Sequence, residues 1–410
     1  MNGTKLYQKL AIVPIVALGL AVAGCNKQSD NGTITPTTTA NTSITTTTGK
    51  NTTLNYSKNS PLDTSNMFTQ TDLTQTVDTT NAKKITLEDG KDVTIDAAGT
   101  YVITGTAKNS TVIVNASADA EVHLVFDNVS ITNTNKPTVY AVNAKNVYVT
   151  TTQNSTNNLK VTGEFTEDDG NDINAVIFAK TNITLNGLGT LNIDSSANGI
   201  ASNSDLKITG GIYNVNTIKH GFKALNSIRV ADGTFNINAT KDGFHSENED
   251  DLTTGYVYIA GGNFTINSED DGIQGTSITE IDGGTFAINA VEGIEGTYVQ
   301  INDGTIKIYA TDDGINASEK ATNYDVQIEI NGGNLDITMA EGDTDALDAN
   351  GTLTINGGYI NITAQFAFDF DLTASLNGGT VIVNGTQVTS ITNSMMEGVG
   401  GPGGFGGPQH

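Results

Sequence analysis

The 410-residue chain lacks tryptophan, has one cysteine (Cys25) and one arginine (Arg229), and is poor in basic residues. Asp and Glu outnumber Lys and Arg by 45 to 20, which gives a formal net charge of −25. Such a charge excludes nucleic acid and anionic lipid as direct partners. Charged residues are only 16% of the chain, whereas glycine occurs 45 times. This composition disfavours a helical enzyme and is typical of a repetitive β-protein.

The chain is rich in one repeated pattern. Between about residues 185 and 384, an apolar residue precedes a Gly-Gly or Asp-Gly pair, and apolar residues follow at alternate positions. The second glycine recurs every 20 to 29 residues, at Gly211, Gly233, Gly262, Gly284, Gly304, Gly333, Gly358 and Gly379. A period of this length with variable insertions predicts a solenoid whose coils share one core.

Each repeat contains three short strand-like pieces. Alternation of apolar and polar residues after the glycines, as in 234–238, indicates a strand with one buried face. A second strand precedes the glycines, and a third follows an earlier bend such as Asp242-Gly-Phe. The units lack the helix-forming half of a leucine-rich repeat. The prediction is an all-β fold, a right-handed parallel β-helix of three-strand coils over about residues 81–395, with Phe235, Phe264 and Phe286 stacked inside.

The two ends of the chain differ from the repeats. Residues 1–24 carry two lysines and then an apolar run, which predicts a secretory signal. Val22-Ala-Gly-Cys25 resembles the bacterial lipobox, so we expect Cys25 to be lipidated; a plain signal peptide is the alternative. Residues 25–80, rich in Thr, Ser and Asn, are expected to be a tether, and 396–410 a glycine-rich flexible tail.

Acidic residues recur at the third bend. Aligned coils place acids just before the bend glycine and three residues later, and neighbouring coils lie about 4.8 Å apart. Carboxylates at this spacing repel one another, and hard oxygen ligands outside the cell indicate Ca²⁺. Asp-Gly is also simply a good turn sequence. The predicted metal ligands are Asp270, Asp271, Glu292, Asp312, Asp313, Asp343, Asp345, Asp348 and Asp369.

Basic residues cluster on the coils just before these acids. Lys219, Lys223, Lys241 and His245, with Glu295 on the acidic side, are predicted to contact an acidic ligand. The basic residues could equally neutralise the neighbouring acids. A β-helix hydrolase of the polygalacturonase kind would carry a Gly-His-Gly segment, which this sequence does not have.

The turns 219–222, 241–245 and 270–274, the Gly-Gly strands and the segments 99–105 and 175–185 resemble the clostridial carbohydrate-binding β-helix family. The resemblance covers about residues 85–392. It implies a fold similar to pectate lyases, Ca²⁺ bound by acids on the coils, and binding of acidic and cellulosic plant polysaccharides without cleavage. Asn198, His220 and Glu292 stand where the family has aspartate, so the resemblance does not extend to metal binding on their coils.

The leading hypothesis is a non-catalytic surface lipoprotein that binds plant cell-wall polysaccharide, acidic by preference, through Ca²⁺ and polar β-faces. Without tryptophan, binding must depend on ions and hydrogen bonds. One alternative is a Ca²⁺-dependent polysaccharide (pectate) lyase with Lys223 or Lys241 as the base. Another is a structural or adhesive surface protein. No pattern implies an oligomer.

Overall fold

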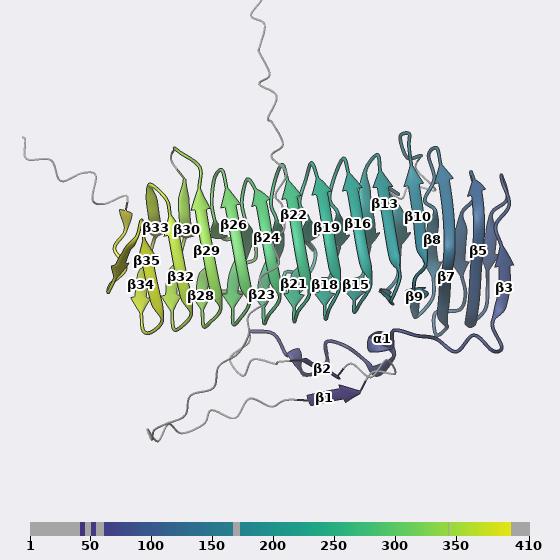
Figure 1. The fold of residues 1–410 in the computed structure, drawn as a ribbon, viewed down its shortest axis with the longest axis horizontal. Helices are drawn as coiled ribbons and strands as arrows, with labels where there is room; N and C mark the ends of the chain where they lie inside the picture. Colours follow the sequence, from purple (N-terminus) through teal and green to yellow (C-terminus); the bar gives the residue numbers. More distant parts are fainter. Residues whose placement is uncertain (1–41, 46–50, 55–60, 167–172, 343, 395–410) are drawn as a thin grey trace, which may run out of the picture. The chain divides into compact units, whose positions relative to one another are not determined.

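Three parallel sheets wind around one apolar core in the computed structural model, which describes residues 42–45, 51–54, 61–166, 173–342 and 344–394. Each coil contributes one strand to each sheet, and equivalent strands of successive coils pair in parallel (Figure 1). The predicted right-handed parallel β-helix is confirmed. No helix among these residues is long and apolar enough to cross a membrane.

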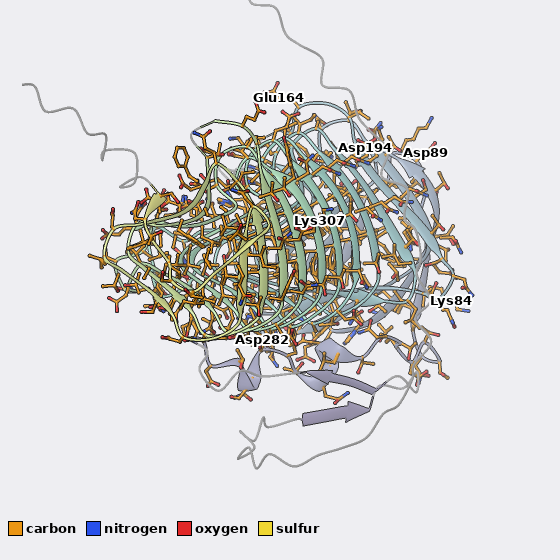
Figure 2. The ribbon with its side chains drawn as sticks, turned by 60° about the vertical axis from the view of Figure 1, so that its left-hand side comes forward. Lys84, Asp89, Glu164, Asp194, Asp282 and Lys307 are labelled. Carbon is orange, nitrogen blue, oxygen red and sulfur yellow. The ribbon has the colours of Figure 1, made fainter. Side chains whose placement is uncertain are left out.

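Sheet A consists of the strands that follow the glycine pairs. Its strands are β10 (Thr156–Val161), β13 (Thr190–Ser195), β16 (Ile212–Thr217), β19 (Thr234–Ala239), β22 (Asn263–Ser268), β24 (Thr285–Ala290), β26 (Thr305–Ala310), β29 (Asn334–Met339), β32 (Tyr359–Thr363) and β35 (Thr380–Val383). β36 (Thr386–Val388) pairs antiparallel with β35 at the end of the sheet. The outer face of sheet A is polar, with side chains such as Asp194 and Lys307 exposed (Figure 2).

Sheet B consists of the strands that precede the glycine pairs. Its strands are β3 (Lys83–Thr86), β5 (Gly99–Lys108), β7 (Glu121–Asn133), β9 (Asn146–Thr151), β12 (Ile183–Gly187), β15 (Asp205–Ile208), β18 (Ser227–Val230), β21 (Tyr256–Ile259), β28 (Gln327–Ile330), β31 (Thr352–Ile355) and β34 (Thr373–Leu376). The long strand β7 continues into sheet A, where it pairs with β10.

Sheet C follows the third bend. Its strands are β4 (Val93–Ile95), β6 (Val112–Asn115), β8 (Val139–Asn143), β11 (Ala175–Ala179), β14 (Asn198–Ser202), β17 (Phe222–Ala224), β20 (Phe244–Ser246), β23 (Ile273–Ile281), β25 (Ile294–Ile301), β27 (Ile315–Ala317), β30 (Asp345–Ala349) and β33 (Phe366–Phe370). Strands β23 and β25 continue from sheet C into sheet B.

The core is built from ladders of equivalent residues. Phe235, Phe264 and Phe286 are Cα partners, and their ring planes lie within 2° of parallel at centroid distances of 4.7 and 4.4 Å. All three side chains are buried, which confirms the predicted aromatic ladder. The glycine pair makes the bend that closes each unit: at Gly262, φ is +122°, and a Cβ there would lie 3.1 Å from the Phe264 ring.

Residues 61–80, here called the N-terminal strap, lie against the outer face of sheet B. The strap contains η1 (Thr64–Asn66) and α1 (Gln70–Leu73), whose capping box joins Thr69 and Asp72. Its apolar side chains pack on the sheet in a small cluster of Met67, Phe68, Leu73, Ala231 and Tyr258. We expected these residues to be part of the tether, but the few apolar side chains are enough to dock them on an existing sheet.

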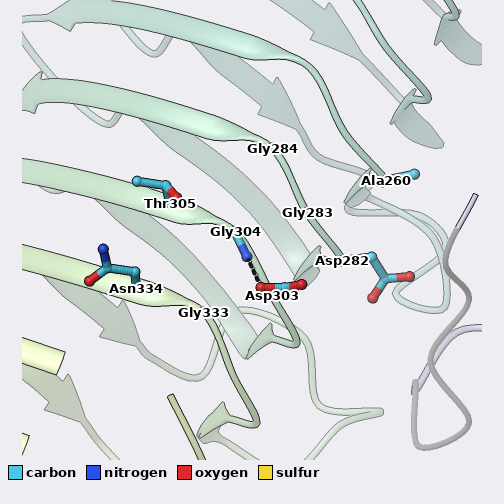
Figure 3. Close-up of a pocket in the computed structure, with 9 residues that line it drawn as sticks. All are labelled: Ala260, Asp282, Gly283, Gly284, Asp303, Gly304, Thr305, Gly333 and Asn334. Carbon is cyan, nitrogen blue, oxygen red and sulfur yellow. Dashed lines mark hydrogen bonds between the residues drawn. The ribbon is translucent and has the colours of Figure 1, made fainter. Parts of the chain in front are cut away.

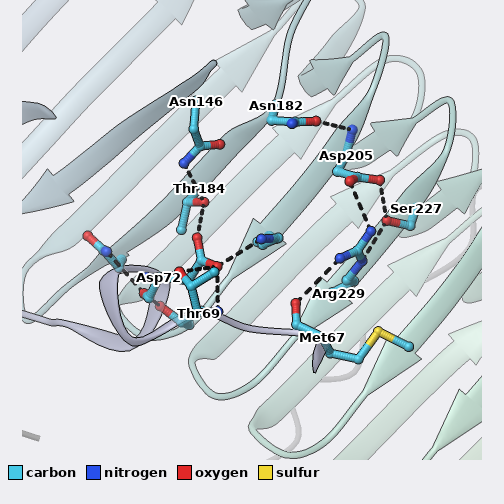
Figure 4. Close-up of polar contacts among 12 residues, drawn as sticks. Met67, Thr69, Asp72, Asn146, Asn182, Thr184, Asp205, Ser227 and Arg229 are labelled. Atoms are coloured by element: carbon cyan, nitrogen blue, oxygen red, sulfur yellow. Dashed lines mark hydrogen bonds and ion pairs between the residues drawn. The ribbon is translucent and has the colours of Figure 1, made fainter. Parts of the chain in front are cut away.

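Polar contacts fix the strap in place (Figure 4). The buried carboxylate of Asp72 lies 2.8 Å from Lys207 Nζ and accepts a 2.9 Å hydrogen bond from Thr184. Arg229 pairs with Asp205 at 2.9 Å and donates to the Met67 carbonyl at 3.4 Å. The strap therefore covers part of sheet B and leaves sheets A and C as the open faces of these coils.

The remaining described elements are β1 (Thr42–Thr45) and β2 (Asn51–Leu54), which pair antiparallel. The predicted signal segment 1–24, the lipidation site Cys25 and the tail 396–410 lie outside the described residues.

Candidate functional site

The predicted ladder at the third bend is present in sheet C. Residues three positions after the bend acid are Cα partners from coil to coil, in the order Lys223, His245, Gln274, Glu295, Asn316, Asp348 and Asp369. The acid column is held by backbone hydrogen bonds, because each bend glycine donates to the carbonyl of the next coil's bend residue. Gly243 donates to Asp271 at 3.0 Å, and Gly272 donates to Glu292 at 2.8 Å.

Glycine allows the coils to approach this closely at the bend. A Cβ on Gly272 would lie 2.5 Å from the Gly293 carbonyl oxygen and 2.5 Å from a methyl carbon of Ile288. Any larger residue would therefore push the coils apart and separate the acidic side chains.

A groove with a volume of about 350 Å³ lies along this ladder. It is lined by His220, Lys241, Asp242, His245, Asp270, Asp271, Gln274, Glu292, Glu295 and Lys320. Within the described part of the chain, three overlapping sets of side chains bring ligand atoms within 4.8 Å of one another, and all three belong to this groove. They are His220, Asp242 and His245; Asp242, Asp270 and Asp271; and Asp271, Glu292 and Glu295.

The third set, like the second, consists of three carboxylates. Asp271 and Glu295 are buried, and Gln274 donates hydrogen bonds to both of them. Asn316 donates to Glu292 at 2.9 Å, and Lys320 Nζ lies 2.7 Å from Glu295 Oε1. The Lys320 ammonium thus neutralises part of the charge of this three-carboxylate cluster. The side-chain amides of Gln274 and Asn316 orient the carboxylates.

Burial and mutual repulsion disfavour the charged forms of these acids. Burial, followed by the charges of Asp242, Glu295 and Glu292, raises the pKa of Asp271 far above its ordinary value. Burial and the Glu295 charge likewise raise the pKa of Glu292. Burial and repulsion therefore oppose deprotonation of these two acids, and a nearby cation would favour it.

Other predicted residues are placed around this cluster. Asp270 pairs with Lys241 at 2.7 Å, which raises the pKa of Lys241. Lys223 is half-buried in the ladder beside His245, and Lys219 is exposed. His245, buried, lies 2.5 Å from Asp242.

The C-terminal acids of the ladder are arranged more loosely. Asp312 is exposed, and Asn393 donates to Asp369 at 2.6 Å. Burial and the Asp348 charge raise the pKa of Asp313 to about 8, and burial and the Asp369 charge raise that of Asp348 to about 6. Asp345 is buried, and its N–H lies 3.4 Å from the Asp313 carboxylate. Asp343 lies outside the described residues.

The sequence did not identify all residues of the groove as functional. His220 and Asp242 are visible in the repeat alignment, but Asp242 was interpreted as a turn residue. Gln274 and Asn316 occupy ladder positions next to acids. This register is the feature of the sequence that could have identified them as residues of the groove. Lys320 comes from the irregular segment between β27 and β28, where the repeat gives no register.

Sheet A offers a second polar surface. Asn192 donates to Asn158 at 2.8 Å, Asn214 to Asn192 at 2.8 Å, and Asn236 to Asn214 at 2.9 Å, so amides run continuously along the sheet. At the glycine bends beside it, a shallow hollow of about 450 Å³ is lined by Asp282, Asp303, Thr305, Asn334 and glycine backbone (Figure 3). Each asparagine amide in this row retains a second N–H donor and a second acceptor lone pair, which can form hydrogen bonds with the hydroxyl groups of a ligand.

The chain is similar to proteins that are described as carbohydrate-binding. A family model described as carbohydrate-binding domain-containing protein matches residues 89–298 and 290–394. A protein of the same description from Acetivibrio thermocellus is 34% identical over 124 residues, which are 30% of this chain and 43% of that relative. The match thus spans less than half of the relative's length.

A solved structure of a polysaccharide lyase-like protein from C. thermocellum, a gadolinium derivative, aligns with a TM-score of 0.47 and 26% identity. The alignment covers 65% of this chain and 100% of that one. Because the family model matches most of the β-helix, the chain belongs to the family of carbohydrate-binding domain-containing proteins.

Proposed function

We propose that this protein binds acidic polysaccharide, polygalacturonate-like and of plant cell-wall origin, through Ca²⁺ held in the sheet C groove. The observation that carries the proposal is the set Asp271, Glu292 and Glu295, whose oxygens lie within 4.8 Å of one another. Ca²⁺ takes six to eight oxygens at about 2.3–2.6 Å, so one ion can contact all three carboxylates. Coordination positions that the protein leaves open would accept a uronate carboxylate.

The raised pKa values of Asp271 and Glu292 support a cation at this place. A divalent ion replaces the protons that the buried carboxylates otherwise need, so Ca²⁺ binding and proton release are coupled. The amide ladder of sheet A would add hydrogen bonds to neutral parts of the polymer, including cellulosic chains.

We propose further that the protein does not cleave its ligand. A lyase base must lose its proton near neutral pH, which requires a lowered lysine pKa. The pKa of Lys241 is instead raised by its hydrogen bond to Asp270. Lys320 also has a raised pKa, because the effect of Glu295 outweighs burial. Both ammonium groups are better suited to pairing with carboxylates than to removing protons.

Affinity electrophoresis tests the binding. Migration should be retarded in gels with polygalacturonate and Ca²⁺, and retardation should disappear with EGTA. Glu292→Gln should weaken it, whereas Glu164→Gln, the same change at an exposed residue in the segment after β10, should not. Retardation that persists in EGTA would show that binding does not require Ca²⁺. Release of unsaturated uronate, detected by its absorbance, would show instead that the protein is a lyase.

We also propose that the protein is lipid-anchored through Cys25 on the outer face of the bacterial membrane. The support is the sequence around Cys25 alone. Cys25→Ala should release the protein into the medium, and full membrane retention of the variant would contradict the anchor.

A further inference from the structure

Two histidines and an aspartate converge at the end of the groove next to the acidic cluster. His220 and His245 lie at the third bends of adjacent coils, and their rings stack at a centroid distance of 4.3 Å. The Nδ1 atoms of both rings approach the same oxygen of Asp242, at 3.3 Å from His220 and 2.5 Å from His245. All three ligand atoms lie within 4.8 Å of one another.

The two histidines contact Asp242 differently. His245 makes a hydrogen bond to Asp242, whereas the buried Nδ1 of His220 lies 3.3 Å from the same oxygen without the geometry of a full hydrogen bond. If Nδ1 of His220 carries no proton, this nitrogen lies close to a carboxylate to which it cannot donate. If it carries one, the proton lies beside the Asp242–His245 contact without a suitable angle of its own. A cation between the three atoms would convert these close contacts into ligand bonds.

The surroundings hold two of the three side chains, Asp242 and His245, in this orientation. The other carboxylate oxygen of Asp242 lies 3.3 Å from the backbone N–H of Asp271, which fixes the carboxylate. The distal nitrogen of His245 lies 3.2 Å from Glu247. Metal-bound histidines characteristically donate their second ring N–H to a carboxylate of this kind.

The ligand types select the metal. Imidazole nitrogens suit zinc, copper and nickel, whereas Ca²⁺ prefers oxygen. In a tetrahedral zinc site with bonds of about 2.0–2.1 Å, ligand atoms are about 3.3 Å apart. The His220–Asp242 distance already has this value. The His245–Asp242 contact must widen from 2.5 Å, and the two stacked rings must turn so that both Nδ1 lone pairs point at one ion. The half-buried Lys223, in register with His245, is the cation that opposes binding.

We infer that His220, Asp242 and His245 form a site for a divalent transition metal of the zinc class, separate from the Ca²⁺ site formed by Asp271, Glu292 and Glu295. Three protein ligands leave one coordination position for water or a ligand oxygen. Asp242 connects the two sites through its contact with Asp271.

Titration of the full chain with Zn²⁺, after chelator treatment and in saturating Ca²⁺, tests the inference. Calorimetry should show one Zn²⁺ site that Ca²⁺ does not displace. Co²⁺ in its place should give the visible absorption of a nitrogen-coordinated tetrahedral ion. His220→Ala should weaken Zn²⁺ binding at least about tenfold and abolish the Co²⁺ spectrum. His123→Ala, a matched change at a distant histidine that stacks on Tyr148, should alter neither.

Two further variants keep the test independent of folding defects. Lys223→Met leaves the ligands intact and should tighten Zn²⁺ binding, because it removes the opposing charge. Glu292→Gln should leave Zn²⁺ binding unchanged while weakening Ca²⁺ binding. The inference is overturned if Zn²⁺ binds equally to wild type and His220→Ala, if Lys223→Met does not tighten binding, or if Glu292→Gln abolishes it.

Discussion

Lys320 Nζ lies 2.7 Å from the buried carboxylate of Glu295, so a lysine from an irregular loop occupies the edge of the three-carboxylate cluster. Its ammonium neutralises the same charge that would attract Ca²⁺. In the proposed Ca²⁺ site, the Lys320 ammonium would therefore compete with the ion for Glu295.

Replacement of Lys320 by methionine should strengthen Ca²⁺ binding. The variant removes the competing cation but keeps the apolar stem, so we expect the Kd for Ca²⁺ to fall about tenfold, or about 1.4 kcal/mol. Calorimetric titration measures the change. Lys307→Met, on the exposed face of sheet A, is the control and should leave the Kd unaltered. An unchanged or weaker affinity in Lys320→Met would mean that the carboxylates do not bind the ion.

Without Ca²⁺, stability should decrease as pH rises. Acids normally titrate near pH 4, but in the folded state burial raises the pKa of Asp348 to about 6 and that of Asp313 to about 8. The folded state then binds more protons than the unfolded state between about pH 4 and 8, so the free energy of unfolding falls across this range. In EGTA, the melting temperature should drop by about 5 °C or more from pH 5 to 8.

Added Ca²⁺ should reduce this decline, because the ion binds the deprotonated carboxylates of the folded state. Differential scanning calorimetry across the pH series provides the measurement. A melting temperature in EGTA that stays constant or rises with pH would contradict the acid ladder as a source of repulsion.

Truncation of Phe264 should destabilise the β-helix without altering its outer surfaces. Phe264 stacks between Phe235 and Phe286, so Phe264→Ala leaves a cavity and should cost about 3–5 kcal/mol. Thr265→Ala, the exposed neighbour on the same strand, should cost far less. Denaturant unfolding compares the two, and polysaccharide affinity at low temperature should be equal to that of wild type.

Loss of the Asp72 carboxylate should release the N-terminal strap. Asp72 is buried and accepts hydrogen bonds from Thr69, Thr184 and Lys207, so Asp72→Ala leaves Lys207 without its partner. Breaking such a pair costs about 3 kcal/mol. Limited proteolysis should cut the variant within residues 61–80 while the coils remain intact. Asp63→Ala, at an exposed cap, should behave as wild type, and equal resistance of both variants would contradict the role of Asp72.

The sequence predicted those features that the repeat itself determines. Once Phe235 and Phe264 are placed at one phase of the period, their stacking follows, and the same holds for the register of Asp348 with Asp369. Features outside the period could not be predicted in this way. Lys320 lies in an insertion, and Asp72 meets Lys207 across 135 residues of chain that share no repeat position.

The convergence of His220 and His245 on Asp242 could be predicted from the sequence only in part. Alignment of the coils places the three residues on neighbouring bends, but it does not show that both rings turn the same nitrogen toward one oxygen. The orientations of Asp242 and His245 depend on the Asp271 N–H and the Glu247 carboxylate, which come from the next coil and from the loop after β20.

The strap also determines how the protein carries mechanical tension. It attaches to strands β12, β15 and β18, well inside the β-helix, before the chain continues to the first coils at β3. A force applied to the chain ahead of residue 61 should therefore act first on the Asp72–Lys207 and Arg229–Met67 contacts. The terminal coils, which would otherwise unwind one at a time from the pulled end, bear force only after the strap has detached.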